Sequence, residues 1–343
     1  MKPAQSVRAG RPRLLAGLCL TLMLALAASA VHGAELTAAA INSAEFSRKK
    51  SLSRDEPTAI GIRLQVLLDR ARFSPGEIDG KFGENAKKAL RAYAEAQQLP
   101  NSDALTDEVW KRLAADNRPV LTSYTITEKD LSGPFLHKLP ARMEDMKSLP
   151  KLSYTSPREG LAEKFHMSEA LLAALNPAQH FDRAGASIVV VDTTEATAAD
   201  SARAERVEVD KVRQTVKLFD RSNALIGFYP ATVGSKEKPS PSGTLKVTAI
   251  NRNPVYRYNP DYHFKGVHSR KPFEIRPGPN NPVGTVWISL SADGYGIHGT
   301  PWPGRVSKAE SHGCVRLTNW DAERVASRVS KHTPVAFVDD ARS

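Results

Sequence analysis

The chain has 343 residues, a formal net charge of +11 at pH 7 and two cysteines. This length excludes a single small domain and predicts two or three domains, each of which buries its own core. The excess of positive charge suits an anionic polymer, either nucleic acid or cell envelope.

Residues 1–34 are predicted to be a secretory signal peptide. They begin with four basic residues, continue through the apolar run LLAGLCLTLMLALAA, and reach the small residues Ala28-Ser29-Ala30. The apolar run is short for a bilayer, and no later segment resembles a membrane span, so we expect a soluble exported protein after cleavage. Removal of this segment leaves a net charge of +7 on the mature chain. An exported protein seldom meets nucleic acid, so the charge favours the cell envelope and no nucleic-acid partner is expected.

The mature chain keeps one cysteine, Cys314, because Cys19 lies in the apolar core of the predicted signal. A single cysteine excludes an intramolecular disulfide. Its thiol is therefore either a buried packing group or a reactive one.

Residues 57–115, which follow a predicted linker at residues 35–56, are expected to form a small three-helix domain. Apolar residues recur at helical spacing on both sides of the turn-rich stretch FSPGEIDGKFG, and a third helix is predicted from Thr106. The stretch LQVLLDRARFSPGEIDGKFGENAKKALRAYAEAQQL, followed by LTDEVW, resembles the peptidoglycan-binding domain found beside many cell-wall hydrolases and transferases. The alternative is that the glycines of this stretch only build a turn.

Residues 116–151 are predicted to be a linker, and residues 152–192 a small α/β module. The pattern of this module is a strand, two short helices and the closing strand in GASIVVVD. The segment resembles a LysM module, which binds the amino-sugar backbone of peptidoglycan or chitin. His166 and His180 are expected to be surface residues.

Residues 193–204, which contain the small polar stretch TTEATAADSARA, are predicted to be a linker before a mostly-β domain at residues 205–340. Apolar and charged residues alternate in this last domain, and loops rich in proline and glycine separate the strands. One helix is expected from about Thr318 through Val329. The whole chain is thus predicted to be a multidomain α+β protein.

The stretch IHGTPWPGRVSKAESHGCVRL carries the residues that would make Cys314 reactive. A neutral thiol is a weak nucleophile and needs a base. His312 lies two residues before Cys314, and His298 lies on a preceding strand that a loop would bring beside it. Gly299 and Gly313 allow close approach of a ligand, and backbone amides around Gly313 would hold an oxyanion.

Arg316 would suit a substrate carboxylate, because its planar guanidinium binds that group with two hydrogen bonds. Two other interpretations of the cysteine stay open. Cys314 would be a small buried hydrophobe in one of them. In the other, His298, His312 and Cys314 would bind zinc with His263 or His268. We expect neither a metal nor a cofactor.

The segments PSPSG, NPVGTVWISL, GYGIHGT and SHGCVRL, in this order, resemble the YkuD-type L,D-transpeptidase catalytic domain, and the likeness covers roughly residues 207–338. The resemblance implies Cys314 as the nucleophile and His298 as its base, oriented by the backbone carbonyl of Gly299. It also implies that His312 and Gly313 complete the site and its oxyanion donors. Ser311 and Arg316 would line the substrate.

The resemblance further implies a reaction on peptidoglycan in the periplasm, with a role in cell-wall organisation and cell shape. The enzyme would cleave after the third residue of a stem tetrapeptide, release D-alanine, and hold the acyl group as a thioester on Cys314. The acyl group would pass to an amine of another stem, a free D-amino acid or a lysine of an envelope protein. The alternatives are an L,D-carboxypeptidase, which transfers to water, and a non-catalytic peptidoglycan-binding protein.

Overall fold

The computed structural model describes residues 36–48, 52–195, 202–262, 267–309, 311 and 313–339. The signal peptide predicted at residues 1–34 lies outside these residues. Within the described part of the chain, no helix has both the length and the apolar character needed to cross a bilayer.

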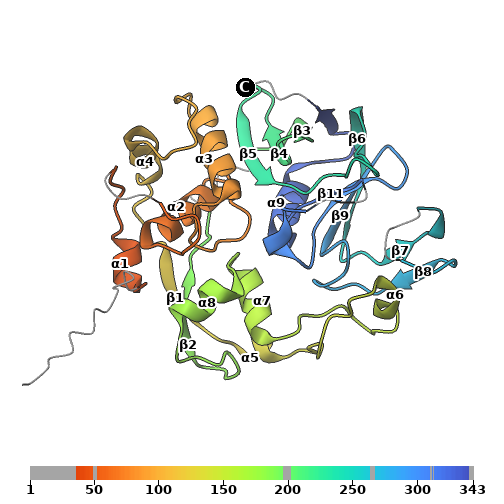
Figure 1. Cartoon of the computed structure of the whole chain (residues 1–343), viewed down its shortest axis with the longest axis horizontal. Helices are drawn as coiled ribbons and strands as arrows, with labels where there is room; N and C mark the ends of the chain where they lie inside the picture. Colours follow the sequence, from red (N-terminus) through yellow and green to blue (C-terminus); the bar gives the residue numbers. More distant parts are fainter. Residues whose placement is uncertain are drawn as a thin grey trace, which may run out of the picture. The chain divides into compact units, whose positions relative to one another are not determined.

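The N-terminal helical domain contains the three helices that the sequence predicts. They are α2 (Ala59–Arg70), α3 (Glu84–Ala96) and α4 (Asp107–Leu113). Threonine hydroxyls cap α2 and α4 by accepting hydrogen bonds from backbone amides of the first turn. A further short helix, α1 (Ala38–Asn42), lies in the expected linker and buries Ile41. Figure 1 shows these four helices in red to yellow-brown, gathered around one another.

The second module is built from strands β1 (Leu121–Thr125) and β2 (Ser187–Val191) and from helices α7 (Pro157–Lys164) and α8 (Glu169–Leu175). The two strands pair antiparallel. The first strand therefore lies inside the expected linker at residues 116–151 and not near residue 153, where the sequence placed it. Moreover, the side chains of this module and of the N-terminal helices belong to one continuous hydrophobic cluster. The two modules share a core instead of being separated by a free linker.

Residues 126–156 connect β1 to α7. This connection contains two short helices, α5 (Glu128–Leu131) and α6 (Met143–Met146). Met146 and Leu152 pack with Ile275 in a separate small cluster, which includes the hairpin of β7 (Tyr256–Tyr258) and β8 (Phe273–Ile275). The Leu152 amide donates to the Pro277 carbonyl at 3.0 Å, and the Asn280 amide donates to the Leu152 carbonyl at 2.9 Å. These contacts hold the residues near 152 against the C-terminal domain, and these residues belong to none of the described strands.

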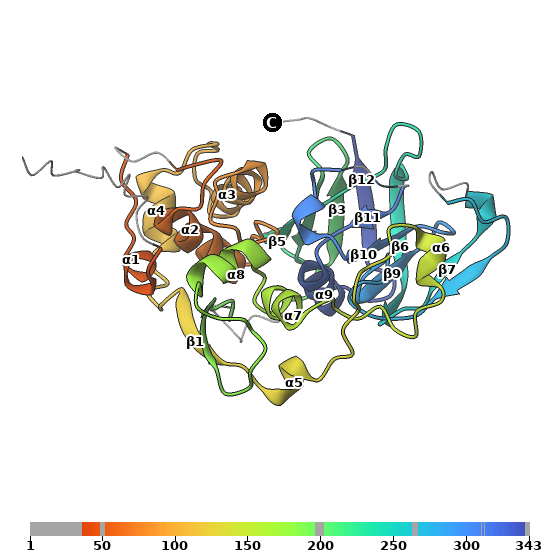
Figure 2. The ribbon, with the colours of Figure 1, turned by 60° about the horizontal axis from the view of Figure 1, so that its bottom comes forward.

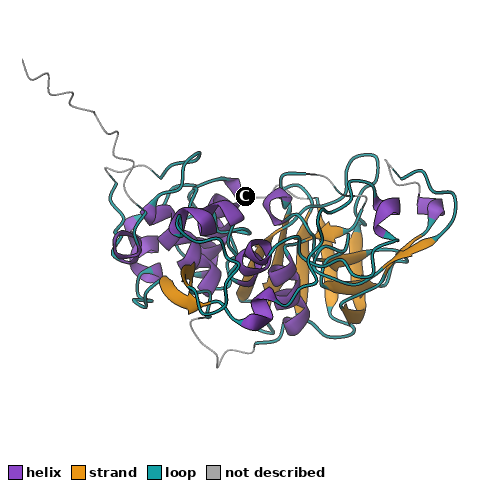
Figure 3. Cartoon of the chain, turned by 90° about the horizontal axis from the view of Figure 1, so that it is seen from below, coloured by secondary structure: helices purple, strands orange, loops and turns teal. Residues whose placement is uncertain are grey.

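The C-terminal domain is mostly β, as predicted, and its main sheet has eight strands in the order β11-β10-β9-β6-β12-β3-β4-β5. Figure 2 shows most of them side by side, and Figure 3 separates this strand-rich part from the helix-rich part of the chain. The bounds are β3 (Arg206–Asp210), β4 (Thr215–Phe219), β5 (Leu225–Pro230), β6 (Gly243–Arg252), β9 (Val286–Leu290), β10 (Gly296–His298), β11 (Val315–Arg316) and β12 (Pro334–Val338). The pairs β10 with β11 and β12 with β3 are parallel, and the other pairs are antiparallel.

Helix α9 (Asn319–Arg328) contacts β9 and β10 and joins all three parts of the chain. On one side, Ala322 and Val325 are buried in the core of the sheet domain. On another side, Arg324 donates two hydrogen bonds, at 2.7 and 3.0 Å, to the buried carboxylate of Asp69 in α2. Burial would raise the pKa of Asp69, but Arg324 and His166 more than offset this and hold that pKa well below its usual range.

His166, which was expected at the surface, instead lies in this junction. Its ring stacks on Trp320 of α9 with centroids 5.0 Å apart, and its Nδ1 is 3.2 Å from Asp69 Oδ2. The side chain is only 13% exposed. The expectation was wrong because His166 contacts residues of α2 and α9, which are distant from it in the sequence, so the junction exists only in the folded chain. His180 is exposed, as predicted.

Candidate active site

Strands β10 and β11 bring Cys314, His298 and Arg316 onto one face of the sheet. In the parallel register, Ile297 lies opposite Val315 and His298 lies opposite Arg316. Cys314 precedes β11 by one residue and therefore comes level with Gly296. Because side chains alternate along a strand, His298, Cys314 and Arg316 point to the same side. The neighbouring strands agree with the sequence-based prediction that a loop brings His298 beside Cys314.

Cys314 carries a half-buried thiol, and it is a free cysteine. Its Sγ lies 3.6 Å from the carbonyl oxygen of Gly294. Burial raises the pKa of the thiol, while a backbone hydrogen bond from Gly296 and the charge of Arg316 act in the opposite direction. The thiol is therefore neutral at rest and needs a base to become a nucleophile.

His298 is 3% exposed and is held in one orientation. Its Nδ1 lies 2.6 Å from the carbonyl oxygen of Gly299, and the ring stacks on Trp287 with centroids 5.3 Å apart and an interplanar angle of 18°. A carbonyl can only accept, so Nδ1 carries the proton and Nε2 presents its lone pair. Burial and the nearby charge of Arg316 lower the pKa of His298 to about 3. The imidazole is thus neutral and able to accept a proton at Nε2.

Gly299 is required because Asn319, the first residue of α9, approaches it closely. A Cβ at position 299 would lie 2.1 Å from Asn319 Oδ1 and 3.2 Å from Asn319 Cα. Asn319 is itself fixed, since its Nδ2 donates to Glu163 Oε1 at 2.9 Å and its Oδ1 accepts from the Thr285 amide at 3.2 Å. α9 therefore packs against Gly299, the residue whose carbonyl orients His298. The same helix also contacts α7 of the second module.

Ser311 and Gly313 form the turn that presents Cys314. Gly313 has φ of +110°, and a Cβ there would lie 2.8 Å from a ring carbon of Tyr295. The Ser311 hydroxyl donates to the Cys314 carbonyl at 2.6 Å and accepts from the Gly313 amide at 3.1 Å. Ser240 donates to the Gly313 carbonyl at 2.7 Å.

This turn changes two expectations from the sequence. Ser311 was expected to line the substrate, but it is 3% exposed and its hydroxyl is used inside the turn. The Gly313 amide was expected as an oxyanion donor, but it already donates to Ser311. The local hydrogen bonds of a serine cannot be read from the motif, because the same residue type serves in substrate sites and in turns.

Two of the predicted histidines, His312 and His263, lie outside the described residues. His268 is described, and its backbone amide donates to Glu144 of α6. In the part of the chain that the structure describes, no three histidine, cysteine or acidic side chains are grouped as metal ligands would be.

Arg316 has an unused donor beside the thiol. Its backbone exchanges two hydrogen bonds with Thr232, at 2.8 and 2.9 Å, which fixes the position of the residue. Its Nε is buried and has no hydrogen-bond partner among the described residues. Burial lowers the pKa of this guanidinium, and the Cys314 thiol and Tyr256 act in the opposite direction. A buried donor without a partner is costly, so the arrangement favours an anionic ligand at this point.

The loop between His298 and Cys314 is held by the N-terminal helical domain, which the sequence did not predict. Asn85 Nδ2 of α3 donates to the Val306 carbonyl at 3.1 Å, and Lys88 Nζ donates to the Ser307 hydroxyl at 2.7 Å. The Ser307 amide donates to the hydroxyl of Thr232 at 2.9 Å. The loop is thus fixed from two sides.

Replacing Asn85 with alanine is expected to lower the rate of the reaction at Cys314 on the order of fivefold, which corresponds to one lost hydrogen bond of about 1 kcal/mol. The effect should appear in kcat more than in KM, because the loop would sample positions away from the reactive geometry. Steady-state kinetics would measure it. Lys87→Ala, which removes an ion pair with Glu84 on the same helix, is the matched control and should leave kcat unchanged. Equal kinetics for both variants would show that the loop does not need this contact.

Glu163 is expected to make the stability of the protein depend on pH. Burial raises the pKa of Glu163 to about 7, although hydrogen bonds from Asn319 and Tyr154 act against it. The folded chain therefore binds more protons at this residue than the unfolded chain, where the pKa is about 4.5. The free energy of unfolding should fall as the pH rises from about 4.5 to 7, by roughly 2–3 kcal/mol from this residue.

Glu163→Gln keeps the acceptor oxygen but cannot ionise, so this variant should be more stable than the parent at pH 8 and similar to it at pH 5. Urea unfolding at both pH values would measure the difference. Comparison with the parent cancels the contributions of other groups, such as His298, which acts in the opposite direction between about pH 3 and 6.5. Glu108→Gln, at an exposed position of α4, is the control. The same pH dependence in parent and Glu163→Gln would contradict the prediction.

The C-terminal part of the chain is similar to known proteins. The family model described as YkuD, L,D-transpeptidase catalytic domain, matches residues 204–336. The Bacillus subtilis (strain 168) protein named "Putative L,D-transpeptidase YkuD" is 30% identical to this chain over 178 residues, which are 52% of this chain and 90% of that protein. The protein of the same name from Bacillus licheniformis is 29% identical over 181 residues, which are 52% of this chain and 92% of that protein.

A solved structure, L,D-transpeptidase 3 from Mycobacterium tuberculosis in complex with a faropenem-derived adduct, aligns with a TM-score of 0.33 and 19% identity. That alignment covers 39% of this chain and 59% of the Mycobacterium protein.

Proposed function

Because this chain belongs to the family of YkuD-type L,D-transpeptidase enzymes, we propose that Cys314 transfers an acyl group from a peptidoglycan stem tetrapeptide to an amine. The observation that carries the proposal is the common face of Cys314, His298 and Arg316, with the tautomer of His298 fixed by Gly299. A nucleophile, an oriented base and a free guanidinium donor are what acyl transfer through a thiol needs.

The first half-reaction forms a thioester. His298 Nε2 accepts the thiol proton, and the thiolate attacks the carbonyl carbon of the third stem residue. The amide bond to the terminal D-alanine breaks, and its nitrogen leaves as an amine after taking the proton back from His298. The thiol and the imidazole are both neutral at rest, and the proton transfer leaves the net charge of the pair unchanged.

The second half-reaction regenerates the enzyme. An acceptor amine attacks the thioester carbonyl while His298 accepts a proton from the amine. The new amide forms, the carbon–sulfur bond breaks, and Cys314 recovers its proton from His298. The amide of Cys314 is the donor that we assign to the oxyanion, since the Gly313 amide is bonded to Ser311. Arg316 holds a carboxylate of the donor stem.

The proposed cellular setting follows from the rest of the sequence. The signal-like residues 1–34 would direct export, and the periplasm is the compartment in which a stem peptide is met. The three-helix domain and the LysM-like module would bind peptidoglycan, which the basic mature chain also suits. Envelope proteins with exposed lysines are further acceptors under this proposal.

The test is mass spectrometry of the protein without residues 1–34, incubated with a disaccharide-tetrapeptide alone or with a second stem or a D-amino acid. We expect loss of D-alanine together with a crosslinked or exchanged product. Loss of D-alanine with hydrolysis alone, in the presence of every acceptor, would replace the transferase by a carboxypeptidase. No loss of D-alanine, with a thiol inert to a carbapenem, would overturn the proposal.

A further inference from the structure

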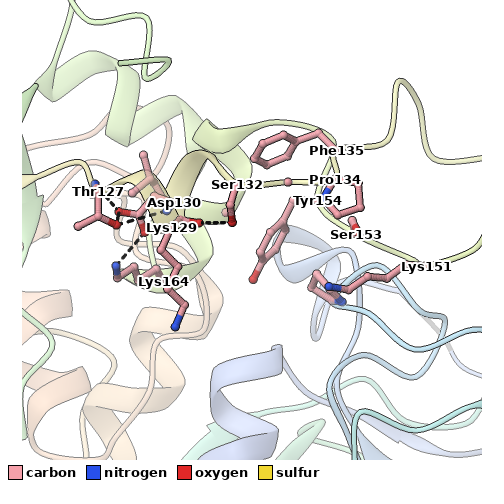
Figure 4. Close-up of a pocket in the computed structure, with 14 residues that line it drawn as sticks. Thr127, Lys129, Asp130, Ser132, Pro134, Phe135, Lys151, Ser153, Tyr154 and Lys164 are labelled. Carbon is pink, nitrogen blue, oxygen red and sulfur yellow. Dashed lines mark hydrogen bonds and ion pairs between the residues drawn. The ribbon is translucent and has the colours of Figure 1, made fainter. Parts of the chain in front are cut away.

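The indole of Trp287 lies directly beside the imidazole of His298. Trp287 is on β9 and His298 is on β10, and the two residues are paired in the antiparallel register. Their rings are stacked, with centroids 5.3 Å apart and an interplanar angle of 18°. Side chains of directly paired residues contact each other on one face of a sheet. Neither residue lines the pocket of about 460 Å³ beside α7, whose lining residues Figure 4 shows.

The position of the indole depends on Ser289 and Gly296. Trp287 Nε1 donates to Ser289 Oγ at 2.9 Å, and Ser289 is paired with Gly296 across the two strands. A Cβ at position 296 would lie 2.6 Å from Trp287 Cζ2 and 2.7 Å from its Cε2, so the missing side chain leaves the space that the indole occupies. Gly296 is level with Cys314 on the neighbouring strand. The indole therefore extends from the imidazole of His298 to the backbone beside Cys314.

The stack limits how the imidazole of His298 can move. The hydrogen bond from Nδ1 to the Gly299 carbonyl, at 2.6 Å, holds one atom of the ring but does not prevent the ring from tilting about that atom. The indole face, which is nearly parallel to the imidazole, opposes this tilt. The two contacts together fix the plane in which Nε2 presents its lone pair.

The indole also lies where a positive charge develops. His298 becomes an imidazolium when it takes the proton of the Cys314 thiol. Burial and the charge of Arg316 both lower the pKa of His298, so they oppose this protonated form. The face of an aromatic ring attracts a cation that lies within about 6 Å of the ring centroid, and the attraction is strongest where water is excluded. The indole of Trp287 meets this condition, and His298 is only 3% exposed.

We infer that Trp287 is a positioning residue of the reaction at Cys314, which fixes the plane of His298 and stabilises the imidazolium formed when His298 takes the thiol proton. Ser289 and Gly296 place the indole for this role. The inference rests on the proposed function in one respect, because it takes His298 as the base.

The experiment measures acylation of Cys314 by a carbapenem in the chain without residues 1–34. The thiol adds to the β-lactam carbonyl, the carbon–nitrogen bond of that ring opens, and the thiol proton passes through His298 to the ring nitrogen. The mass of the adduct is therefore the sum of the two molecules, and no amine acceptor is needed. Mass spectrometry over a range of carbapenem concentrations separates the rate constant of acylation from the dissociation constant of the complex that precedes it.

Trp287→Leu is expected to lower the rate constant of acylation roughly tenfold and to leave the dissociation constant nearly unchanged. Trp287→Phe keeps an aromatic face and should stay within about threefold of the parent. Ser289→Ala keeps the indole and removes its hydrogen bond, so it should slow acylation about threefold and tests the same point if Trp287→Leu is unstable. Trp110→Leu, at a buried tryptophan of α4, is the matched control and should leave the rate constant unchanged.

The His298→Gln background decides whether Trp287 acts through the base. Acylation is slow in this background and is followed over hours. Adding Trp287→Leu should cause no further loss, because the imidazole on which the indole acts is already absent. A further tenfold loss would show that the indole supports the fold or the thiol, and it would overturn the inference.

Three other results would also overturn it. They are a parent rate in Trp287→Leu, a loss confined to the dissociation constant, and a Trp287→Phe variant as slow as Trp287→Leu. A carbapenem adduct in a protein that releases no D-alanine from a tetrapeptide would contradict the proposed function alone. The comparison of the variants would still decide the role of Trp287, so the two failures are distinguishable.

Discussion

Replacing Cys314 with alanine is expected to lower the rate of acyl transfer by at least about a thousandfold, because the proposed thioester intermediate forms on its thiol. The fold should survive, since the half-buried Sγ is a weak hydrogen-bonding group in its contacts with the Gly294 carbonyl, at 3.6 Å, and with the backbone of Gly296. The release of D-alanine, followed by chromatography, measures the first effect. Thermal unfolding measures the second, and we expect the melting temperature to change by no more than about 3 °C.

Two companion variants make the result specific. Cys314→Ser keeps the size of the side chain but carries a hydroxyl that His298 activates poorly, so it should be nearly as inactive as Cys314→Ala. His298→Gln should also lose most of the activity, because the thiol then has no base. If Cys314→Ala retained a tenth or more of the parent rate, the thioester mechanism would be lost. A large fall in its melting temperature would instead show that the thiol is a packing group.

Replacing Gly299 with alanine is expected to reduce both stability and activity. The added methyl group would meet Asn319 Oδ1 at 2.1 Å, so either the asparagine or the 298–299 backbone must move. Overpacking of this kind costs about 1–3 kcal/mol. A shift of the Gly299 carbonyl would also turn His298 away from Cys314, and a displacement near 1 Å lowers a rate by roughly a hundredfold. Urea unfolding and steady-state kinetics measure the two effects.

A double-mutant cycle separates this steric effect from a general loss of stability. Asn319→Ala removes the oxygen that the new methyl group meets, so the double variant Gly299→Ala, Asn319→Ala should be less damaged than the sum of its single variants. Gly83→Ala is the matched control, because a Cβ there meets no atom within 4 Å and the cost is at most about 1 kcal/mol. Strict additivity of the two single variants would show that Gly299 acts in some way other than contact with Asn319.

The sequence predicted the parts of this protein that depend on local pattern. The periodicity of apolar residues gave the helices of the N-terminal domain, and the alternation of residues 286–290 matches β9, where Val286, Ile288 and Leu290 are buried. The His298 and Cys314 motifs were also enough to expect neighbouring strands. These signals are short in range, and the residues that produce them are close in the chain.

The features that were missed depend on contacts between distant residues. β1 was assigned to a linker because its partner β2 lies about sixty residues later in the chain. In addition, a strand of a two-stranded sheet shows only a weak alternation of apolar and polar residues. Asn319 and Glu163 are 156 residues apart, and each is an ordinary polar residue of a helix when considered alone. In these two cases the missing information was tertiary. Ser311 differs, because its hydrogen bonds are local, with Gly313 and Cys314, and a serine of a motif can serve either in a substrate site or in a turn.

The ion pairs of α9 limit how this chain can be divided. Arg324 and Arg328 reach Glu195, and Arg324 also holds Asp69, so the helix that supports Gly299 has its charges neutralised by residues before position 204. A fragment cut at the start of the matched catalytic region would leave buried guanidinium groups without carboxylates. A unit for grafting, domain exchange or expression should therefore keep α2 and Glu195 together with α9, and a catalytic region transplanted alone would need a redesigned surface on α9.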